Sequence, residues 1–164
     1  MLRCGRLLVA SLLFAVASAS PAAAAPPELS RAARWLQSYL RIDTTNPPGH
    51  EEKSAAFLAA ILHRAGVATE TIVSASGRTS LYARLAADQP SGEGALVLLH
   101  HMDVVPAGED WTVPPFSGLI RNGNLWGRGA IDDKSLGIAE LAAFLDVARS
   151  HQPRHRDLIF LAVA

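Results

Sequence analysis

The sequence predicts an α/β fold: a three-layer sandwich with helices on both faces of a mostly parallel central sheet. Three observations predict this fold. Helix-like and strand-like apolar patterns alternate along the chain. Two continuous apolar runs, at residues 95–99 and 158–163, are typical of strands that are covered on both faces. A helical pattern lies between the two runs, and a strand–helix–strand unit has parallel strands and a right-handed crossover.

The composition is that of one globular domain. Of the 164 residues, 49% are apolar, which is ample for a packed core. The 15 Lys and Arg residues balance 15 Asp and Glu residues, so charge gives no reason to expect nucleic acid or an anionic membrane as a partner. Cys4 is the single cysteine, which excludes a disulfide scaffold.

Residues 1–24 have the pattern of a secretory signal peptide. Arg3 and Arg6 precede an apolar segment at 7–17, and small residues at 22–24 form a cleavage site. We therefore expect an exported protein, periplasmic or secreted, whose mature part is 25–164. The alternative is an uncleaved membrane anchor, because alanines up to residue 25 lengthen the apolar segment toward the roughly 20 residues that a span needs.

Two helices are expected first along the mature chain. Segment 29–42 places apolar residues on one stripe at helical spacing, and an Asn-Pro-Pro-Gly sequence at 46–49 then breaks the pattern. Segment 51–65 has acidic residues in its first turn, an apolar stripe, and Gly66 as a C-cap.

Strands and one further helix complete the expected fold. Segments 69–74 and 80–86 have the β-branched and alternating patterns of short strands. A long loop rich in proline and glycine follows the apolar run at 95–99. A helix at 134–149 then leads to the last strand, which is expected at 158–163.

Polar side chains gather where ligands bind in this class of fold, beyond the carboxyl ends of the strands. His100, His101 and Asp103 follow the run at 95–99, and Asp132 and Asp133 precede the helix at 134–149. His101 and Asp103 are two residues apart, so in extended backbone their side chains point to the same side.

This pattern suits a metal site. A neutral imidazole can bind zinc through one nitrogen while a carboxylate fixes the other N–H, and Asp132 offers oxygens for a further metal bond. The residue spacing leaves plain alternatives open. A His-x-Asp sequence also occurs in turns, and Asp132 and Asp133 are suited to capping a helix.

The amino-acid sequences of two long motifs resemble those of the zinc exopeptidase family that includes aminoacylase, carboxypeptidase G, carboxypeptidase S, acetylornithine deacetylase and succinyl-diaminopimelate desuccinylase. The resemblance runs from about residue 29 to the end of the chain. The Trp-x-x-Pro-Pro-Phe sequence is most similar to the carboxypeptidase S and N-acyl-amino-acid hydrolase branch. The residues that carry the resemblance are LLHHMDVVPA at 98–107, Trp111, PPFSG at 114–118, LWGRGAIDDK at 125–134, and TNPPG at 45–49 with Glu51.

The resemblance implies a di-zinc site. In it His101 would bind one zinc, Asp132 would bridge two zinc ions, and Asp103 would act in catalysis by orienting His101. Cobalt and manganese are alternative metals for the same ligands. The Asp132–Asp133 peptide bond is expected to be cis. One departure is His100, where relatives usually carry a small residue; we interpret its side chain as structural, facing away from His101, although it could instead crowd the strand end.

The function implied for the whole family protein is hydrolysis of a small peptide or an N-acyl amino acid by a zinc-bridging water. Residues 25–164 would be the N-terminal part of the catalytic domain, without the inserted domain that a homodimer requires. The general base and three metal ligands are expected beyond residue 164, so this chain alone is expected to be inactive. The strand at 158–163 is expected to form an unpaired apolar edge. The alternative is a non-catalytic exported binding module that retains a remnant metal site.

Overall fold

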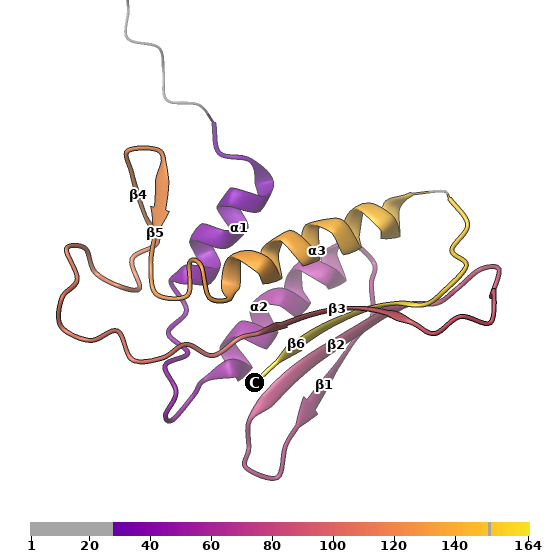
Figure 1. The fold of residues 1–164 in the computed structure, drawn as a ribbon, viewed down its shortest axis with the longest axis horizontal. Coiled ribbons are helices and arrows are strands. Elements are labelled where there is room, and N and C mark those ends of the chain that lie inside the picture. Colours follow the sequence, from indigo (N-terminus) through magenta and orange to yellow (C-terminus); the bar gives the residue numbers. More distant parts are fainter. Residues whose placement is uncertain (1–27, 151) are drawn as a thin grey trace, which may run out of the picture.

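The computed structural model describes residues 28–150 and 152–164, so the signal peptide expected at 1–24 lies outside the described residues. Three helices and six strands form the described part of the chain (Figure 1). In chain order they are α1 (Arg31–Leu40), α2 (Glu51–Arg64), β1 (Thr69–Val73), β2 (Thr79–Leu85), β3 (Leu96–His101), β4 (Leu119–Arg121), β5 (Asn124–Trp126), α3 (Lys134–Arg149) and β6 (Leu158–Val163).

The α/β class is confirmed, and each helix and strand expected from the sequence is present within two residues of its expected bounds. The main sheet has the strand order β1-β2-β6-β3. β3 and β6 run parallel and are joined through α3, as the strand–helix–strand pattern predicts. The other two pairings, β1 with β2 and β2 with β6, are antiparallel, so the described sheet is mixed rather than mostly parallel.

The core lies between the sheet and the helices. Leu81 on β2 and Phe160 on β6 are fully buried and share one cluster with Leu58 of α2 and Leu141 of α3. These strand residues lie on one face of the sheet, so α2 and α3 cover the same face (Figure 1). The helix α1 packs against α3. Two layers of the expected three are therefore present in the described residues.

The second face of the sheet explains a correction to the expected burial of β3. The apolar run at 95–99 predicts a strand covered on both faces, but Val97 and Leu99 are 45% and 51% exposed. They lie on the face opposite to α2 and α3, over which the described residues place no helix. The apolar run therefore gives β3 a second apolar face, which no described residue covers.

The strand at the edge of the sheet also differs from the expected one. Segment 158–163 was expected to be an unpaired edge, but β6 lies in the middle of the sheet because β2 pairs with it on one side and β3 on the other. β3 is the edge on that side. The hazard of an apolar edge therefore belongs to β3.

The long loop, for which the sequence predicts no regular structure, contains a hairpin. β4 and β5 pair antiparallel around the two residues Asn122 and Gly123, whose φ angles are 53° and 76°. Asn-Gly with two positive φ angles is the signature of a two-residue hairpin turn. The three-residue strands on either side were too short to show an alternating pattern. In a separate finding, no helix among the described residues is long and apolar enough to span a membrane.

Candidate metal site

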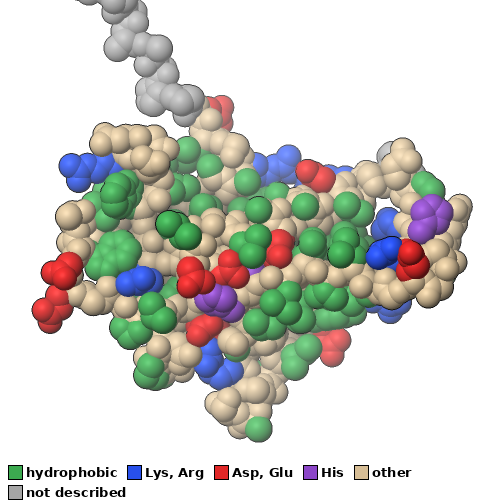
Figure 2. Space-filling view, in the orientation of Figure 1, with side chains coloured by type: hydrophobic (Ala, Val, Ile, Leu, Met, Phe, Trp, Pro, Cys, Tyr) green, Lys and Arg blue, Asp and Glu red, His purple; other side chains and the backbone are tan. Residues whose placement is uncertain are grey.

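His101 is the last residue of β3, and its side chain is on the face of the sheet opposite to the core. Acidic side chains and a histidine gather near the middle of the molecular face in Figure 2, with hydrophobic side chains on both sides. The sequence predicts that His101 lies just after the strand at 95–99, and in the structure it is the last residue of β3, at the carboxyl end. This is the position at which α/β sheets bind ligands.

Asp132 meets His101 from the loop that precedes α3. Nε2 of His101 lies 2.9 Å from Oδ1 of Asp132, although 31 residues separate the two in the chain. The Asp132 side chain is 86% exposed, so this oxygen is open to solvent and to a ligand. The structure thus brings together His101 and Asp132, the two metal ligands that the resemblance implies.

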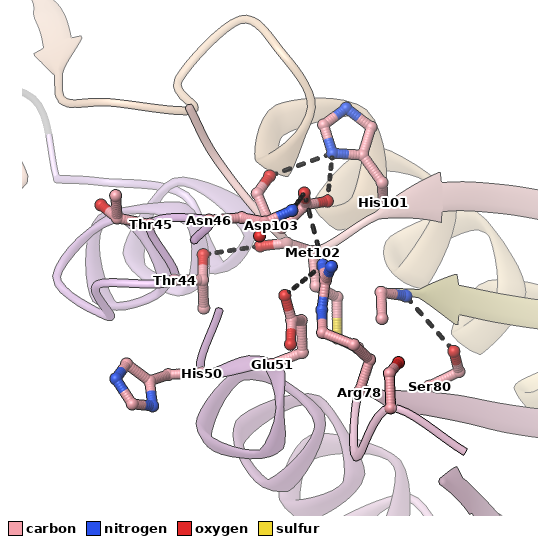
Figure 3. Close-up of polar contacts among 12 residues, drawn as sticks. Thr44, Thr45, Asn46, His50, Glu51, Arg78, Ser80, His101, Met102 and Asp103 are labelled. Atoms are coloured by element: carbon pink, nitrogen blue, oxygen red, sulfur yellow. Dashed lines mark hydrogen bonds and ion pairs between the residues drawn. The ribbon is translucent and has the colours of Figure 1, made fainter. Parts of the chain in front are cut away.

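Asp103 holds the other side of the imidazole. Nδ1 of His101 lies 3.2 Å from Oδ1 of Asp103 and 3.0 Å from the carbonyl oxygen of the same residue (Figure 3). A histidine ring that donates Nδ1–H to these oxygens has Nε2 free for a metal. This is the orienting position that the resemblance implies for Asp103.

The pKa values of these two residues depart from their ordinary values in opposite directions. Burial lowers the pKa of His101, but hydrogen bonds and charges from Asp132 and Asp103 outweigh this effect and raise it. Burial raises the pKa of Asp103, but the hydrogen bond from Asn46 and the positive charges of His101 and Arg78 outweigh it and lower the pKa. Both shifts favour a charged pair, and a bound cation would take the place of the proton on His101.

A cavity of about 480 Å³ opens beside His101 and Asp132. Its walls are mostly apolar and include Val105, Trp111 and Ile131. Arg128 braces one wall, because its guanidinium stacks over the Trp111 ring at 5.2 Å and donates to the carbonyl oxygens of residues 106 and 107. A small molecule with an apolar group and a polar end near His101 would fit this cavity.

The helix-capping alternative for the Asp132–Asp133 pair finds no support in the hydrogen bonds. Asp133 stands at the N-cap position of α3, but its side chain makes no capping hydrogen bond. The peptide bond between Asp132 and Asp133 is cis, as the resemblance implies.

His100 faces away from the site, as we interpreted it from the sequence. Its side chain is fully buried, lies beside Phe160, and has Nδ1 3.2 Å from Oε2 of Glu140 on α3. Burial, and then the charge of His101, lower the pKa of His100 to about 4, so the ring is neutral at pH 7. The side chain therefore belongs to the core and not to the metal site.

Four residues around the site received no role from the sequence. Lys134 is fully buried, and its Nζ donates to the carbonyl oxygens of Tyr39 and Ile42 at 3.2 and 2.6 Å, which ties the start of α3 to the end of α1. Asn46, Glu51 and Arg78 form a polar group next to Asp103 (Figure 3). Asn46 and Glu51 stand in or next to the motif at 45–49 that carries the resemblance, but Arg78 lies in the turn before β2, outside the motifs.

The sequence resembles known peptidases. Residues 97–164 match the family described as Peptidase family M20/M25/M40. A succinyl-diaminopimelate desuccinylase of Methylobacterium sp. (strain 4-46) is 42% identical over 113 residues, which are 65% of this chain and 27% of that protein. A mouse N-fatty-acyl-amino acid synthase/hydrolase, PM20D1, is 49% identical over 67 residues, or 40% of this chain and 13% of that protein.

Solved structures have the same fold at low identity. The M20 family metallo-carboxypeptidase Sso-CP2 from Sulfolobus solfataricus has a TM-score of 0.66 at 20% identity, over 82% of this chain and 31% of that chain. Human carnosine dipeptidase 1 has a TM-score of 0.62 at 23% identity, over 80% of this chain and 31% of that chain. The chain spans 26–30% of the length of the first three desuccinylases that it matches.

Proposed function

We propose that this chain, a segment of an M20/M25/M40-family peptidase, supplies His101 and Asp132 as ligands to a di-zinc centre in a hydrolase that cleaves amide bonds. One observation carries the proposal: Nε2 of His101 and Oδ1 of Asp132 converge to 2.9 Å beside the cavity. The names of the matched proteins, a desuccinylase, an N-fatty-acyl-amino acid hydrolase and a dipeptidase, support small acylated amino acids or short peptides as substrates.

The chemistry of the two donors fits zinc. Imidazole nitrogen and carboxylate oxygen are standard zinc ligands, each at about 2.0–2.2 Å, and two donors 2.9 Å apart can both contact one ion at these lengths. The exposed carboxylate of Asp132 would be available to hold a second ion. Cobalt and manganese accept the same donors and are alternatives in the cell.

The residues of this chain would orient the reactants. When bound, zinc supplies a Lewis acid for the carbonyl and lowers the pKa of a water molecule. With a metal ion on Nε2, Asp103 would accept Nδ1–H of His101 and so keep Nε2 directed at Asp132. The apolar walls around Trp111 would bind the apolar part of the substrate and exclude bulk water from the scissile bond.

The same geometry supports weak zinc binding by this chain on its own. In the described ranges 28–150 and 152–164, no three His, Cys, Asp or Glu side chains are grouped so that they could hold one ion. The carboxylates that line the cavity, Asp103 and Asp132, both contact His101 already. We therefore expect the purified chain to bind zinc weakly and not to hydrolyse substrate.

A metal titration tests the proposal. The purified chain is titrated with Zn²⁺ against a chromophoric chelator, and with Co²⁺ while visible absorption is recorded. His101→Ala and Asp132→Ala should each weaken binding at least tenfold, whereas His155→Ala, at an exposed histidine that contacts Gln89, should leave it unchanged. Equal affinity in all variants would refute the ligand assignment.

Hydrolysis of N-succinyl or N-acyl amino acids is assayed with the same preparations. Metal-dependent turnover by the chain alone would contradict the expected inactivity, and it would also exclude the alternative of a non-catalytic binding module. Zinc binding without turnover agrees with both of these functions. A longer protein that contains this segment then separates them, since only the hydrolase would show turnover.

A further inference from the structure

The carboxylate of Asp103 is held on both of its oxygens. Oδ1 faces Nδ1 of His101 at 3.2 Å. Oδ2 accepts a hydrogen bond from Nδ2 of Asn46 at 3.0 Å and lies 3.4 Å from Nη2 of Arg78 (Figure 3). The three partners come from separate parts of the chain: the end of β3, the loop between α1 and α2, and the turn between β1 and β2. With both oxygens engaged, the carboxylate cannot rotate without loss of a hydrogen bond.

Arg78 is in turn fixed by Glu51, the first residue of α2. Nη2 of Arg78 donates to Oε1 of Glu51 at 2.5 Å, and Glu51 is only 2% exposed. Gly49 closes this site from the other side: a Cβ atom there would lie 2.6 Å from Oε1 of Glu51 and 3.0 Å from Nε of Arg78. Because a buried carboxylate needs its counter-charge, Glu51 holds the guanidinium in place.

We propose that Arg78 and Asn46 are positioning residues for the metal site, which act by fixing the Asp103 carboxylate so that it accepts Nδ1–H of His101 and leaves Nε2 directed toward Asp132. The inference rests on the proposed function, because that function gives Nε2 its task as a zinc ligand. Asn46 and Arg78 contact Asp103, which contacts the ligand His101, and Glu51 contacts Arg78, so none of the three touches metal or substrate. Residues that contact a metal ligand directly change metal affinity through the orientation of that ligand, and Asn46 and Arg78 would act through Asp103, which is such a residue.

A purely structural role is the competing explanation. The Glu51–Arg78 pair also joins α2 to the β1–β2 turn, and its loss could loosen the fold without any specific effect on His101. The two explanations differ in what happens to the imidazole. The contacts of Nδ1 with Asp103 favour the Nδ1–H tautomer of neutral His101, and the contact of Nε2 with Asp132 favours Nε2–H. Loss of Arg78 and Asn46 frees the Asp103 carboxylate to rotate, so the population should shift toward Nε2–H. A structural role alone has no such consequence while the protein stays folded.

The test uses a double variant that avoids a lone buried charge. Arg78→Met alone would strand Glu51, so Arg78→Met is combined with Glu51→Gln, a neutral replacement of similar size. Arg84→Met is the matched control, since Arg84 pairs with Asp157 at an exposed site. Circular dichroism and amide NMR spectra establish that each variant is folded. The ¹⁵N shifts of the His101 ring are measured in zinc-free protein at a pH where the ring is neutral, and Zn²⁺ affinity is measured by chelator competition.

The expected result is a shift of His101 from the Nδ1–H tautomer toward Nε2–H and a loss of Zn²⁺ affinity of about tenfold in the double variant, at the lower end of the range for residues that contact a ligand directly. The Arg84→Met control should match the parent protein in both measurements. Asn46→Ala, which removes only the amide donor to Oδ2, should shift both readouts in the same direction by less. It remains informative where the double variant fails to fold.

A folded double variant with an unchanged tautomer and a Zn²⁺ affinity within twofold of the parent would overturn the inference. So would an unchanged tautomer in a folded Asn46→Ala variant. Failure of the proposed function has a different signature. In that case the parent protein shows no His101-dependent Zn²⁺ binding, while the tautomer measurement still tests whether Arg78 and Asn46 orient the ring.

Discussion

The imidazole of His100 occupies the space that a side chain at Gly137 would need. A Cβ atom at Gly137 of α3 would overlap the Cδ2 and Nε2 atoms of the buried His100 ring. The strand and the helix therefore approach each other at this point only because a large residue on β3 faces a residue without a side chain on α3. Gly137 therefore makes room for the His100 ring in this chain.

This relationship predicts energetic coupling. Gly137→Ala should destabilise the protein by about 1–3 kcal/mol, because the added methyl group overpacks the core. His100→Ala should cost about 2–4 kcal/mol through the cavity that it leaves. In the double variant the new methyl group enters the vacated space, so its loss should be at least about 1 kcal/mol smaller than the sum of the single losses.

Urea unfolding of the four proteins measures this coupling. Gly94→Ala is the control, because a Cβ atom at Gly94 has no neighbour within 4 Å and should change stability little. Additive losses in the double variant would show that His100 and Gly137 do not share one space.

The neutral state of His100 predicts a pH dependence of stability. Its pKa is about 4 in the folded protein and about 6.5 when unfolded. Between these values the unfolded chain binds a proton that the folded protein does not, so stability falls as the pH falls from about 6.5 to about 4. The full effect of this one group is about 3 kcal/mol, and it is absent above pH 6.5.

The measurement compares unfolding free energies at pH 7 and pH 4.5, in the presence of a chelator, for the parent protein and for the His100→Ala/Gly137→Ala variant. The difference between the two proteins measures the loss of stability that depends on His100, including its effect on its neighbours Glu140 and His101. An equal loss of stability in both would mean that His100 is protonated in the folded state.

The edge strand predicts self-association. β3 presents Val97 and Leu99 on a face that the described residues leave open, along an edge with unpaired backbone groups. Val97→Lys should lower aggregation, as measured by light scattering and sedimentation, at little cost in folding free energy. Leu136→Lys on α3, which also replaces a half-exposed apolar residue, should have a much smaller effect on aggregation.

The expected leader predicts a defined mature N-terminus. We expect cleavage after Ala24, so that N-terminal sequencing of the exported protein begins at Ala25. Ala24→Leu should block cleavage because the residue before the cut must be small, whereas Ala23→Leu should be tolerated. An intact N-terminus on a membrane-bound product would instead support the uncleaved anchor.

Much of the fold could be predicted from local patterns. Helical spacing of apolar residues located α1, α2 and α3, and apolar runs located β3 and β6, because burial of one face imposes these periods on the sequence. The order of the strands in the sheet could not be predicted in this way. That β2 pairs with β6 depends on competition among all strands for neighbours, and no local pattern at residues 79–85 records the outcome.

The candidate site was also predictable only in part. His101 and Asp132 stand in long motifs, and the sequences of these motifs identified them. β3 and the loop before α3 bring the two residues together. Arg78 could not be found, because a single arginine in a surface turn resembles any solvated charge until the fold places it beside Asp103. The Asn122–Gly123 sequence is typical of a hairpin turn, but strands of three residues are too short to show the alternating pattern that would confirm a hairpin.

The central place of β6 has a consequence for the order in which the chain can assemble. β6 follows β2 and β3 in the chain, and it is the strand through which the β1–β2 pair and β3 join one sheet. A growing or translocating chain therefore holds the β1–β2 hairpin and β3 as separate pieces until residues 158–163 arrive. Formation of the four-stranded sheet therefore depends on residues 158–163, and deletion of β6 would separate the β1–β2 hairpin from β3.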